Sequence, residues 1–201
     1  MNNNQINPRL LVLLLIIALG ALVRLVNAAE PSAISVFTPI GAMGLFGGAH
    51  FSNRWKAYLF PLLALLLSDL AVNLIIFKGQ YGVMYAGWYG VYAIFALIVF
   101  IGQSMLKKVS FKNILLAAVV ASLTHWILSD LMSFFSPYSL DLRTGKPFTK
   151  DLDGLIQCYW QALPYLRNFF AGTLVYSALM FGAFELAKRR FPALAFEKVT
   201  A

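Results

Sequence analysis

Long apolar runs separated by short polar segments fill most of the 201-residue chain. An α-helix rises about 1.5 Å per residue, so roughly 20 apolar residues cross the hydrocarbon core of a bilayer. Six runs approach that length and predict transmembrane helices over residues 10–27, 34–51, 57–77, 83–105, 113–135 and 168–187. The pattern therefore predicts an all-α membrane protein of about six transmembrane helices, forming a single transmembrane domain over residues 1–201.

Two segments depart from this simple alternation. The first run could instead be a cleaved signal peptide, because Arg9 precedes it and residues 26–28 resemble a cleavage site. Arg24, late in the same run, favours a helix end that meets the lipid head groups. Residues 154–166, GLIQCYWQALPYL, are aromatic, semi-polar and interrupted by Pro164. We expect them to form an interfacial or re-entrant segment on the outer side.

The composition supports a membrane protein. Hydrophobic residues make up 60% of the chain, and the mean hydropathy is +0.74. Charged residues make up 12%, about half the share of a soluble domain. The net charge of +8 would suggest nucleic-acid binding in a soluble protein. Here the basic residues lie mostly between apolar runs, where they orient helices in a bilayer. We therefore expect a lipid bilayer and no nucleic acid as partner.

The basic residues are divided unequally between the two sides of the six predicted helices. One side carries ten of them: Arg9, Arg54, Lys56, Lys107, Lys108, Lys112, Lys188, Arg189, Arg190 and Lys198. The other side carries six: Arg24, Lys78, Arg143, Lys146, Lys150 and Arg167. Cytoplasmic loops are enriched in Lys and Arg. The division predicts that both termini are cytoplasmic and that the long polar loop before residue 154 lies outside.

Polar and aromatic side chains gather in the outer halves of the predicted helices. Such groups are costly inside a bilayer and are functional candidates by default. Aromatic walls with a few orienting polar groups are typical of a small-molecule pocket. The candidate substrate-binding residues are Asp69, Asn73, Trp88, Tyr89, Tyr92, His125, Ser129, Asp130, Tyr159 and Trp160. The depth pattern predicts a pocket open to the outside.

Several of these residues also have structural interpretations. Asp69 could pair with Arg24, and His125 could hydrogen-bond a neighbouring helix. The stripe that begins with Tyr85 and Trp88 could be an interfacial aromatic belt. Cys158 is expected to be a small semi-buried residue, with a thiol ligand to a metal as the alternative.

The second predicted helix carries glycines on one face. Gly41, Gly44 and Gly48 are three and four residues apart, and the last two form a GxxxG motif. Glycines spaced in this way let another helix approach closely. We expect this face to pack inside the protein rather than to form a dimer.

The sequence contains few enzyme signatures. GxSxG, HExxH, paired cysteines and a nucleotide-binding loop are all missing from it. Asp69 and Asp130 lie at similar predicted depths on different helices, so an intramembrane aspartyl protease is the best enzymatic hypothesis. The main expectation is a protein that is not an enzyme and that uses no cofactor.

Three segments carry a resemblance to a known family. They are FTPIGAMGLFGGAHF from Phe37, PLLALLLSDL from Pro61 and GLIQCYWQALPYLRNFFAGTLVYSALMFG from Gly154. They resemble an uncharacterised family of small bacterial membrane proteins, which in turn resembles the S (substrate-binding) components of energy-coupling factor (ECF) vitamin transporters. The resemblance covers roughly residues 10–187.

This resemblance implies a six-helix S-component-like bundle in the bacterial cytoplasmic (inner) membrane. It implies capture of a vitamin or related micronutrient from outside, either with an ECF transmembrane subunit and ATPases as partners or in a solitary mode without them. S components often carry Ala-x-x-x-Ala on the first helix for docking. This first helix has Ala18, Gly20 and Ala21 without that motif, which puts a shared motor in doubt. The alternative is a non-catalytic structural or assembly membrane protein.

Overall fold

The computed structural model describes residues 7–29, 36–80 and 82–194. The helices are α1 (Pro8–Ala29), α2 (Ile40–His50), α3 (Arg54–Ala71), α4 (Trp88–Met105), α5 (Phe111–Phe135), α6 (Leu152–Gln161) and α7 (Leu163–Arg190). A π-helical turn, Val72–Ile76, continues α3, and a 3-10 turn, Pro192–Leu194, follows α7. Two short antiparallel strands, β1 (Leu140–Asp141) and β2 (Lys146–Pro147), form a hairpin between α5 and α6.

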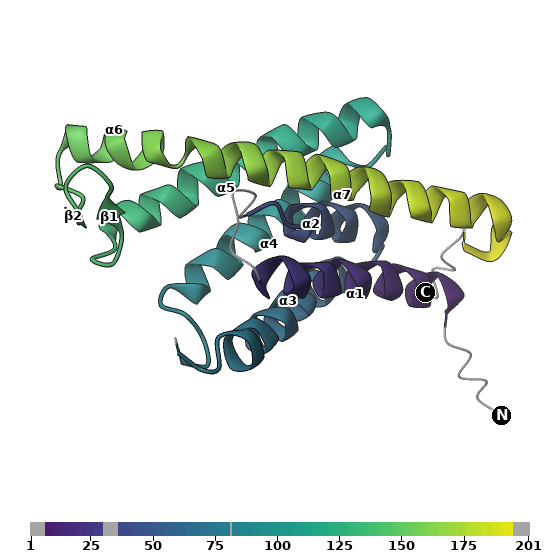
Figure 1. Cartoon of the computed structure of the whole chain (residues 1–201). Helices are drawn as coiled ribbons and strands as arrows, with labels where there is room; N and C mark the ends of the chain where they lie inside the picture. Colours follow the sequence, from purple (N-terminus) through teal and green to yellow (C-terminus); the bar gives the residue numbers. More distant parts are fainter. Residues whose placement is uncertain (1–6, 30–35, 81, 195–201) are drawn as a thin grey trace.

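Five helical segments of the described chain are long and apolar enough to cross a membrane. They are Pro8–Val26, Arg54–Ile76, Trp88–Met105, Phe111–Phe135 and Leu163–Arg190. They correspond to five of the six predicted helices, so the all-helical, multi-span prediction is confirmed at this level. The long helices run between two ends of the molecule (Figure 1). We call the end with the hairpin and α6 the hairpin end, and the end with the start of α1 and the last turns of α7 the terminal end.

The alternation of helix directions agrees with the sequence prediction. At the terminal end, Arg9 of α1 donates hydrogen bonds to the carbonyl of His50 at the end of α2 (3.0 Å) and to that of Leu194 (3.2 Å). The starts of α3 and α5 lie at this end too (Figure 1). The two chain ends of the described helical core are therefore on the same side of the bundle.

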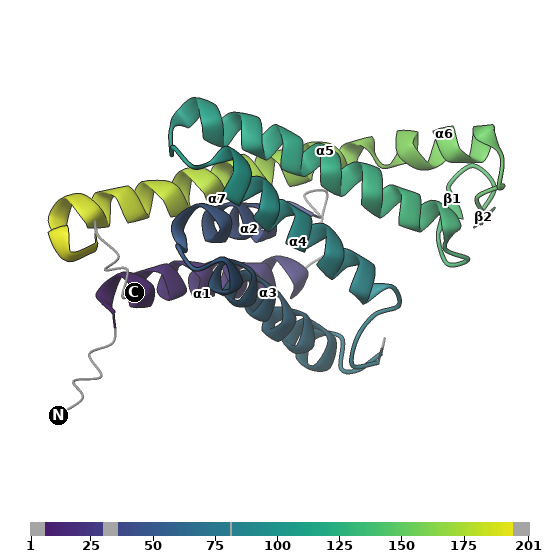
Figure 2. The ribbon, with the colours of Figure 1, turned by 180° about the vertical axis from the view of Figure 1, so that it is seen from behind.

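The second predicted span differs most from the structure. The predicted run began at residue 34, and residues 30–35 lie outside the described chain, while residues 37–39 are not helical. Helix α2 has 11 residues, about 17 Å at 1.5 Å per residue, too short for a core of about 30 Å. Ten of those residues are buried. The other helices therefore enclose α2, with α1 and α7 on one face (Figure 1) and α3 and α4 on the opposite face (Figure 2).

The non-helical backbone before α2 lies inside the bundle. A Cβ atom on Gly172 of α7 would be 2.9 Å from the backbone nitrogen of Thr38. Irregular backbone at membrane depth is tolerated where protein buries it. The apolar pattern of this run gave no sign of the non-helical residues 37–39 that precede α2.

The glycine face of α2 packs within the protein, as predicted. A Cβ on Gly48 would lie 2.3 Å from the carbonyl oxygen of Val99, and one on Gly102 of α4 would lie 2.7 Å from that of Leu45. One on Gly41 would lie 2.3 Å from Thr173 Oγ1 of α7. The absence of side chains at these glycines lets α2 contact the backbone of α4 directly.

Two helix boundaries differ from the prediction because of Gly and Pro. Gly82 and Gly87 have φ of +79° and +80°, so α4 begins at Trp88 rather than near residue 83. Pro164 lies in the first turn of α7, where a missing N–H costs nothing, so the last helix begins at Leu163 rather than 168.

Helix α6 packs on α5 and exposes Leu152, Ile156 and Trp160 on one face, as suits an interfacial helix.

Candidate functional site

The carboxylate of Asp69 is at the centre of a buried polar cluster near the hairpin end. Asp69 on α3 is 1% exposed and forms an ion pair with Arg24 of α1. The hydroxyls of Tyr92 and Tyr85 donate to its Oδ2 at 2.9 and 3.4 Å. Arg24 also donates to Ser68 Oγ at 2.8 Å. The pairing of Asp69 with Arg24, one of the two interpretations drawn from the sequence, is therefore confirmed.

Asn73 completes this cluster through the backbone. Its Nδ2 donates to the carbonyl oxygen of Asp69 at 3.0 Å, and both residues are buried. It lies in the π-helical turn, in which Phe77 N–H donates to the Val72 carbonyl at 2.9 Å. The Asp69 carbonyl also accepts from the Val72 N–H, so the Asn73 amide adds a second donor at the junction of α3 and the π-helical turn. The cluster joins α1, α3 and α4 by satisfied polar contacts.

A separate cavity of about 260 Å³ lies between α5 and the start of α7. Its lining residues are Val36, His125, Trp126, Ser129, Asp130, Ser133, Tyr165 and Leu166. Three of the ten predicted site residues, His125, Ser129 and Asp130, are among them. His125 and Ser129 are four residues apart and share one face of α5, and Asp130 lies beside Ser129. We call this the α5–α7 cavity.

Polar groups in the α5–α7 cavity are poorly satisfied. Trp126 Nε1 is buried and has no hydrogen-bond partner in the described chain. The His125 ring stacks on Phe169 with centroids 4.1 Å apart, yet no described residue hydrogen-bonds to it. Nor does any described donor reach the carboxylate of Asp130, and Ser129 Oγ has only a 3.5 Å contact to the Trp126 carbonyl. The cavity therefore presents both a hydrogen-bond donor and a carboxylate acceptor.

The other predicted aromatic residues do not line this cavity. Trp88 is 41% exposed and meets Tyr92 edge to face at 5.4 Å. Tyr89 and Trp160 are 70% and 68% exposed, as residues of an interfacial belt are. Tyr159 donates to the Ile127 carbonyl at 2.8 Å and packs edge to face on Trp126, so it contacts a residue of the cavity wall without lining the cavity itself. The ten predicted residues thus divide into a satisfied cluster, a cavity and a surface belt.

The sequence prediction missed part of the cavity wall. Trp126 follows His125 directly, and its indole N–H is a donor that a membrane helix cannot satisfy by itself. Tyr165 and Leu166 belong to the aromatic segment that we expected at the interface. These two could have been found by noting that Pro164 starts a helix, which brings the following residues against α5.

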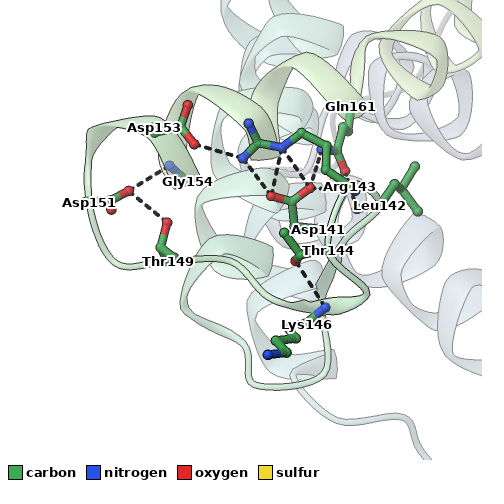
Figure 3. A network of polar contacts seen from close by, with 10 residues as sticks. All are labelled: Asp141, Leu142, Arg143, Thr144, Lys146, Thr149, Asp151, Asp153, Gly154 and Gln161. Atoms are coloured by element: carbon green, nitrogen blue, oxygen red, sulfur yellow. Dashed lines mark hydrogen bonds and ion pairs between the residues drawn. The ribbon is translucent and has the colours of Figure 1, made fainter.

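A network of ion pairs closes the hairpin end (Figure 3). Arg143 contacts Asp141 at 2.7 Å and Asp153 at 2.8 Å, and Gln161 Nε2 donates to Asp141 Oδ1 at 2.9 Å. Hydrogen bonds from Arg143 and then from Gln161 hold the pKa of Asp141 well below its usual range. Asp151 caps α6 by accepting from Gly154 N–H at 2.8 Å. The network fixes the hairpin on α6.

The described residues offer little for a metal. No group of three or more His, Cys, Asp or Glu side chains in the described chain could hold an ion. Cys158 is buried, and its Sγ donates to the backbone carbonyl of Asp130 at 3.4 Å. Burial raises the pKa of this thiol, which disfavours the thiolate that a metal needs. Its position fits the small semi-buried residue expected from the sequence.

Comparison with known proteins identifies a family but no function. No curated protein and no solved structure matches the chain. The family match agrees with the resemblance to an uncharacterised family, and it contains no link to ECF S components, so that further resemblance stays a prediction. A family of unknown function, DUF6580, matches residues 4–194, and the chain belongs to that family.

Proposed function

We propose that this protein is a substrate-binding membrane subunit, similar to an S component, that captures a small micronutrient from the extracytoplasmic side. The observation that carries the proposal is the α5–α7 cavity with its unsatisfied polar groups. Buried polar atoms are normally hydrogen-bonded, and each exception needs an explanation. A bound ligand supplies one for Trp126 Nε1, and it would also meet the half-buried His125 ring and Asp130 carboxylate, which line the same cavity.

The cavity limits the ligand that it would take. Its volume, about 260 Å³, is just below the roughly 300–1,000 Å³ of drug-sized pockets, so the ligand is compact or only partly enclosed. The carboxylate of Asp130 favours a cationic or donor group, and Trp126 Nε1 favours an acceptor. The His125 ring, which stacks on Phe169 from behind, gives the cavity a flat face. A small heterocyclic, vitamin-like molecule with both kinds of polar group meets these requirements.

The direction of capture follows from the basic residues. The terminal end carries ten Lys and Arg in the predicted topology and the hairpin end six, which favours a cytoplasmic terminal end in a bacterial inner membrane. The α5–α7 cavity is reached from the outer half of α5. The chain has no nucleotide-binding loop, so an ATP-driven cycle would need an ECF transmembrane subunit and ATPases as separate chains. The missing Ala-x-x-x-Ala on α1 favours action without them.

The contacts of Asp69 support a non-enzymatic role. An aspartyl dyad works because two carboxylates share one proton at short range. Asp69 is instead ion-paired with Arg24 and accepts hydrogen bonds from Tyr92 and Tyr85, whereas Asp130 lines a cavity without Asp69. The printed partners of Asp69 in the described chain are an arginine, two tyrosine hydroxyls and no second carboxylate.

Native mass spectrometry of protein purified in mild detergent tests the proposal. We expect a bound small molecule in the wild type. Asp130→Asn should weaken its binding about 10- to 100-fold, since a hydrogen bond to a charged group contributes about 1.5–3 kcal/mol. Trp126→Phe should weaken it a few-fold through loss of the indole N–H. Trp88→Phe is the matched control and should bind like the wild type. Binding that depends on Trp88 and not on Asp130 or Trp126 would contradict this location.

A further inference from the structure

A second and larger cavity lies at the terminal end, away from the α5–α7 cavity. Its volume is about 710 Å³, and it lies between the end of α2, the start of α5 and the last turns of α7. Its polar lining consists of Arg9, His50, Ser110, Glu185 and Lys188. Its apolar lining includes Val109, Phe111, Ile114, Phe181 and Phe184. The sequence pattern indicated a role in membrane orientation for Arg9 and Lys188 but no binding site formed by these residues.

The charges around this cavity favour an anion. Two cations, Arg9 and Lys188, face one carboxylate, Glu185, which is 2.7 Å from Lys188. Both cations also lie over the Phe184 ring, 5.5 and 5.8 Å from its centroid. Because these side chains already cover that aromatic ring, it is not open to a cationic ligand.

The start of α5 adds positive potential to the same cavity. Its first turn contains no acidic residue, and its N-cap, Ser110, accepts hydrogen bonds from Asn113 N–H at 3.2 Å and Ile114 N–H at 2.9 Å. In the described chain no acceptor contacts the N–H groups of Phe111 and Lys112. Helix amino termini with free N–H groups attract phosphate. This turn therefore complements Lys188 across the opening.

His50 provides an independent sign of a ligand in the cavity. The residue is 6% exposed, and its ring is held by Phe46, Phe181 and Phe184 with centroids 4.4–5.1 Å away. Its Nδ1 is 3.2 Å from the Phe46 carbonyl, which can only accept, so Nδ1 carries the proton. In the neutral ring Nε2 is then an acceptor, and no described residue donates to it. A ligand that binds here meets this acceptor as well as the two cations.

From these features we infer that the terminal-end cavity binds the head group of a phospholipid. The phosphate lies between Lys188 and the first turn of α5, and a hydroxyl or ammonium of the head group donates to His50 Nε2. Phe111, which is 84% exposed, and Ile114 supply an apolar wall along which acyl chains can leave toward the bilayer. A soluble phosphate would gain nothing from that wall. Basic pockets between the cytoplasmic ends of membrane helices are a known setting for lipid head groups.

Lipid titration of the full chain in detergent, followed by native mass spectrometry, tests the inference. Phosphatidylglycerol should bind saturably at one site per chain. Lys188→Gln should weaken that binding about fivefold, since one basic residue near a membrane surface contributes about 1 kcal/mol. Arg189→Gln removes the same charge from the neighbouring residue, which is exposed and does not line the cavity. It should change binding less than twofold. Equal losses in the two variants would overturn the inference, because they would mean a general basic belt.

A second variant tests the head-group contact. His50→Phe keeps an aromatic ring among three phenylalanines and removes Nε2. In the wild type, phosphatidylglycerol should bind at least threefold more tightly than phosphatidylcholine, whose choline carries no hydrogen-bond donor. His50→Phe should abolish that preference while leaving the Lys188 dependence intact. A preserved preference would overturn the assignment of His50. Competition by glycerol 3-phosphate or inorganic phosphate at the affinity of the lipid would overturn the lipid assignment in favour of a soluble anion.

Discussion

Asp69 and Asp130 are acidic residues of membrane-spanning helices, yet their surroundings are opposite. Asp69 has an arginine, two tyrosine hydroxyls and a nearly complete burial. Asp130 has a cavity beside it and no hydrogen-bond donor among the described residues. Burying a carboxylate in the membrane costs free energy unless it is paired or hydrogen-bonded. Contacts within the protein compensate this cost for Asp69, whereas for Asp130 only water or a ligand can do so.

Asp69 and Asp130 lie at similar predicted depths in the membrane, so depth does not distinguish a structural acidic residue from a functional one. Their hydrogen-bond and ion-pair partners do. The Arg24–Asp69 cluster joins α1, α3 and α4, so its removal should change stability and leave binding in the α5–α7 cavity alone. The groups around Asp130 are expected to behave in the reverse way. Substitutions that keep the size of a side chain and remove one interaction can therefore test whether the Asp69 cluster serves stability and the groups around Asp130 serve binding.

The largest effect is expected for Asp69→Asn. The substitution keeps the side-chain volume and leaves Arg24 as a charge without its carboxylate partner. Breaking a buried ion pair in this way typically costs about 3–5 kcal/mol. Thermal unfolding in detergent, or unfolding in mixed micelles with SDS, measures the loss. Asp130→Asn is the matched control and should leave stability unchanged or slightly higher, because it removes a charge that no described group compensates.

A double substitution sharpens the same test. Replacing both members of a buried pair by apolar residues of similar size is often neutral or stabilising. Arg24→Met combined with Asp69→Leu should therefore recover much of the stability that Asp69→Asn loses. If the double variant is no more stable than Asp69→Asn, the ion pair is not the reason for the loss.

A smaller effect is expected for Tyr92→Phe. It removes the 2.9 Å hydrogen bond to Asp69 but retains the ring that packs on Trp88. Hydrogen bonds between membrane helices contribute about 0.6 kcal/mol on average and at most about 1.7, so we expect a loss of about 1 kcal/mol. Tyr165→Phe, in the cavity, should not lower stability, since no described residue hydrogen-bonds to its hydroxyl. Equal destabilisation by the two variants would remove the distinction between cluster and cavity.

The helices were predictable from the sequence where length and environment agree. The runs that became α1, α3, α5 and α7 are apolar over at least 18 residues, and lipid or protein can accept such a face. The run that became α2 looked the same, because an apolar segment has the same pattern whether it crosses a membrane or is enclosed by other helices. Gly41, Gly44 and Gly48 indicated that other helices enclose this segment, because glycines allow close contact with a helix and a face toward lipid does not require them.

The site was predictable only in part, because a sequence gives depth but not the direction in which each helix faces its neighbours. Asp69 and Asp130 have similar predicted depths, so we grouped them in one pocket. In the structure Asp69 faces α1 and Asp130 faces the start of α7. Spacing along one helix was sufficient to group His125 with Ser129, and Asp130, the next residue, lines the same cavity. Contacts between helices, such as Tyr92 to Asp69, depend on packing that no single segment encodes.

The smallest effect is expected for Arg143→Gln, which breaks an aspartate–arginine pair in the exposed hairpin rather than in the bundle. Asp141 contacts Arg143 and Gln161 (Figure 3), and the side chains of Arg143 and Asp153 in this network are 45% and 65% exposed. Exposed pairs of this kind contribute little to global stability. Hydrogen exchange in the variant should therefore be faster in the hairpin backbone, while the melting temperature stays at the wild-type value.

The same network also predicts a dependence on pH. The folded-state pKa of Asp141 is lowered, so the contribution of Asp141 to hairpin stability is complete above the unfolded pKa of about 4 and is lost as pH falls through the folded value. Acidification of the wild type should accordingly reproduce the faster exchange, and Arg143→Gln should lose this pH dependence. A drop in melting temperature like that of Asp69→Asn would mean that the hairpin is part of the cooperative core.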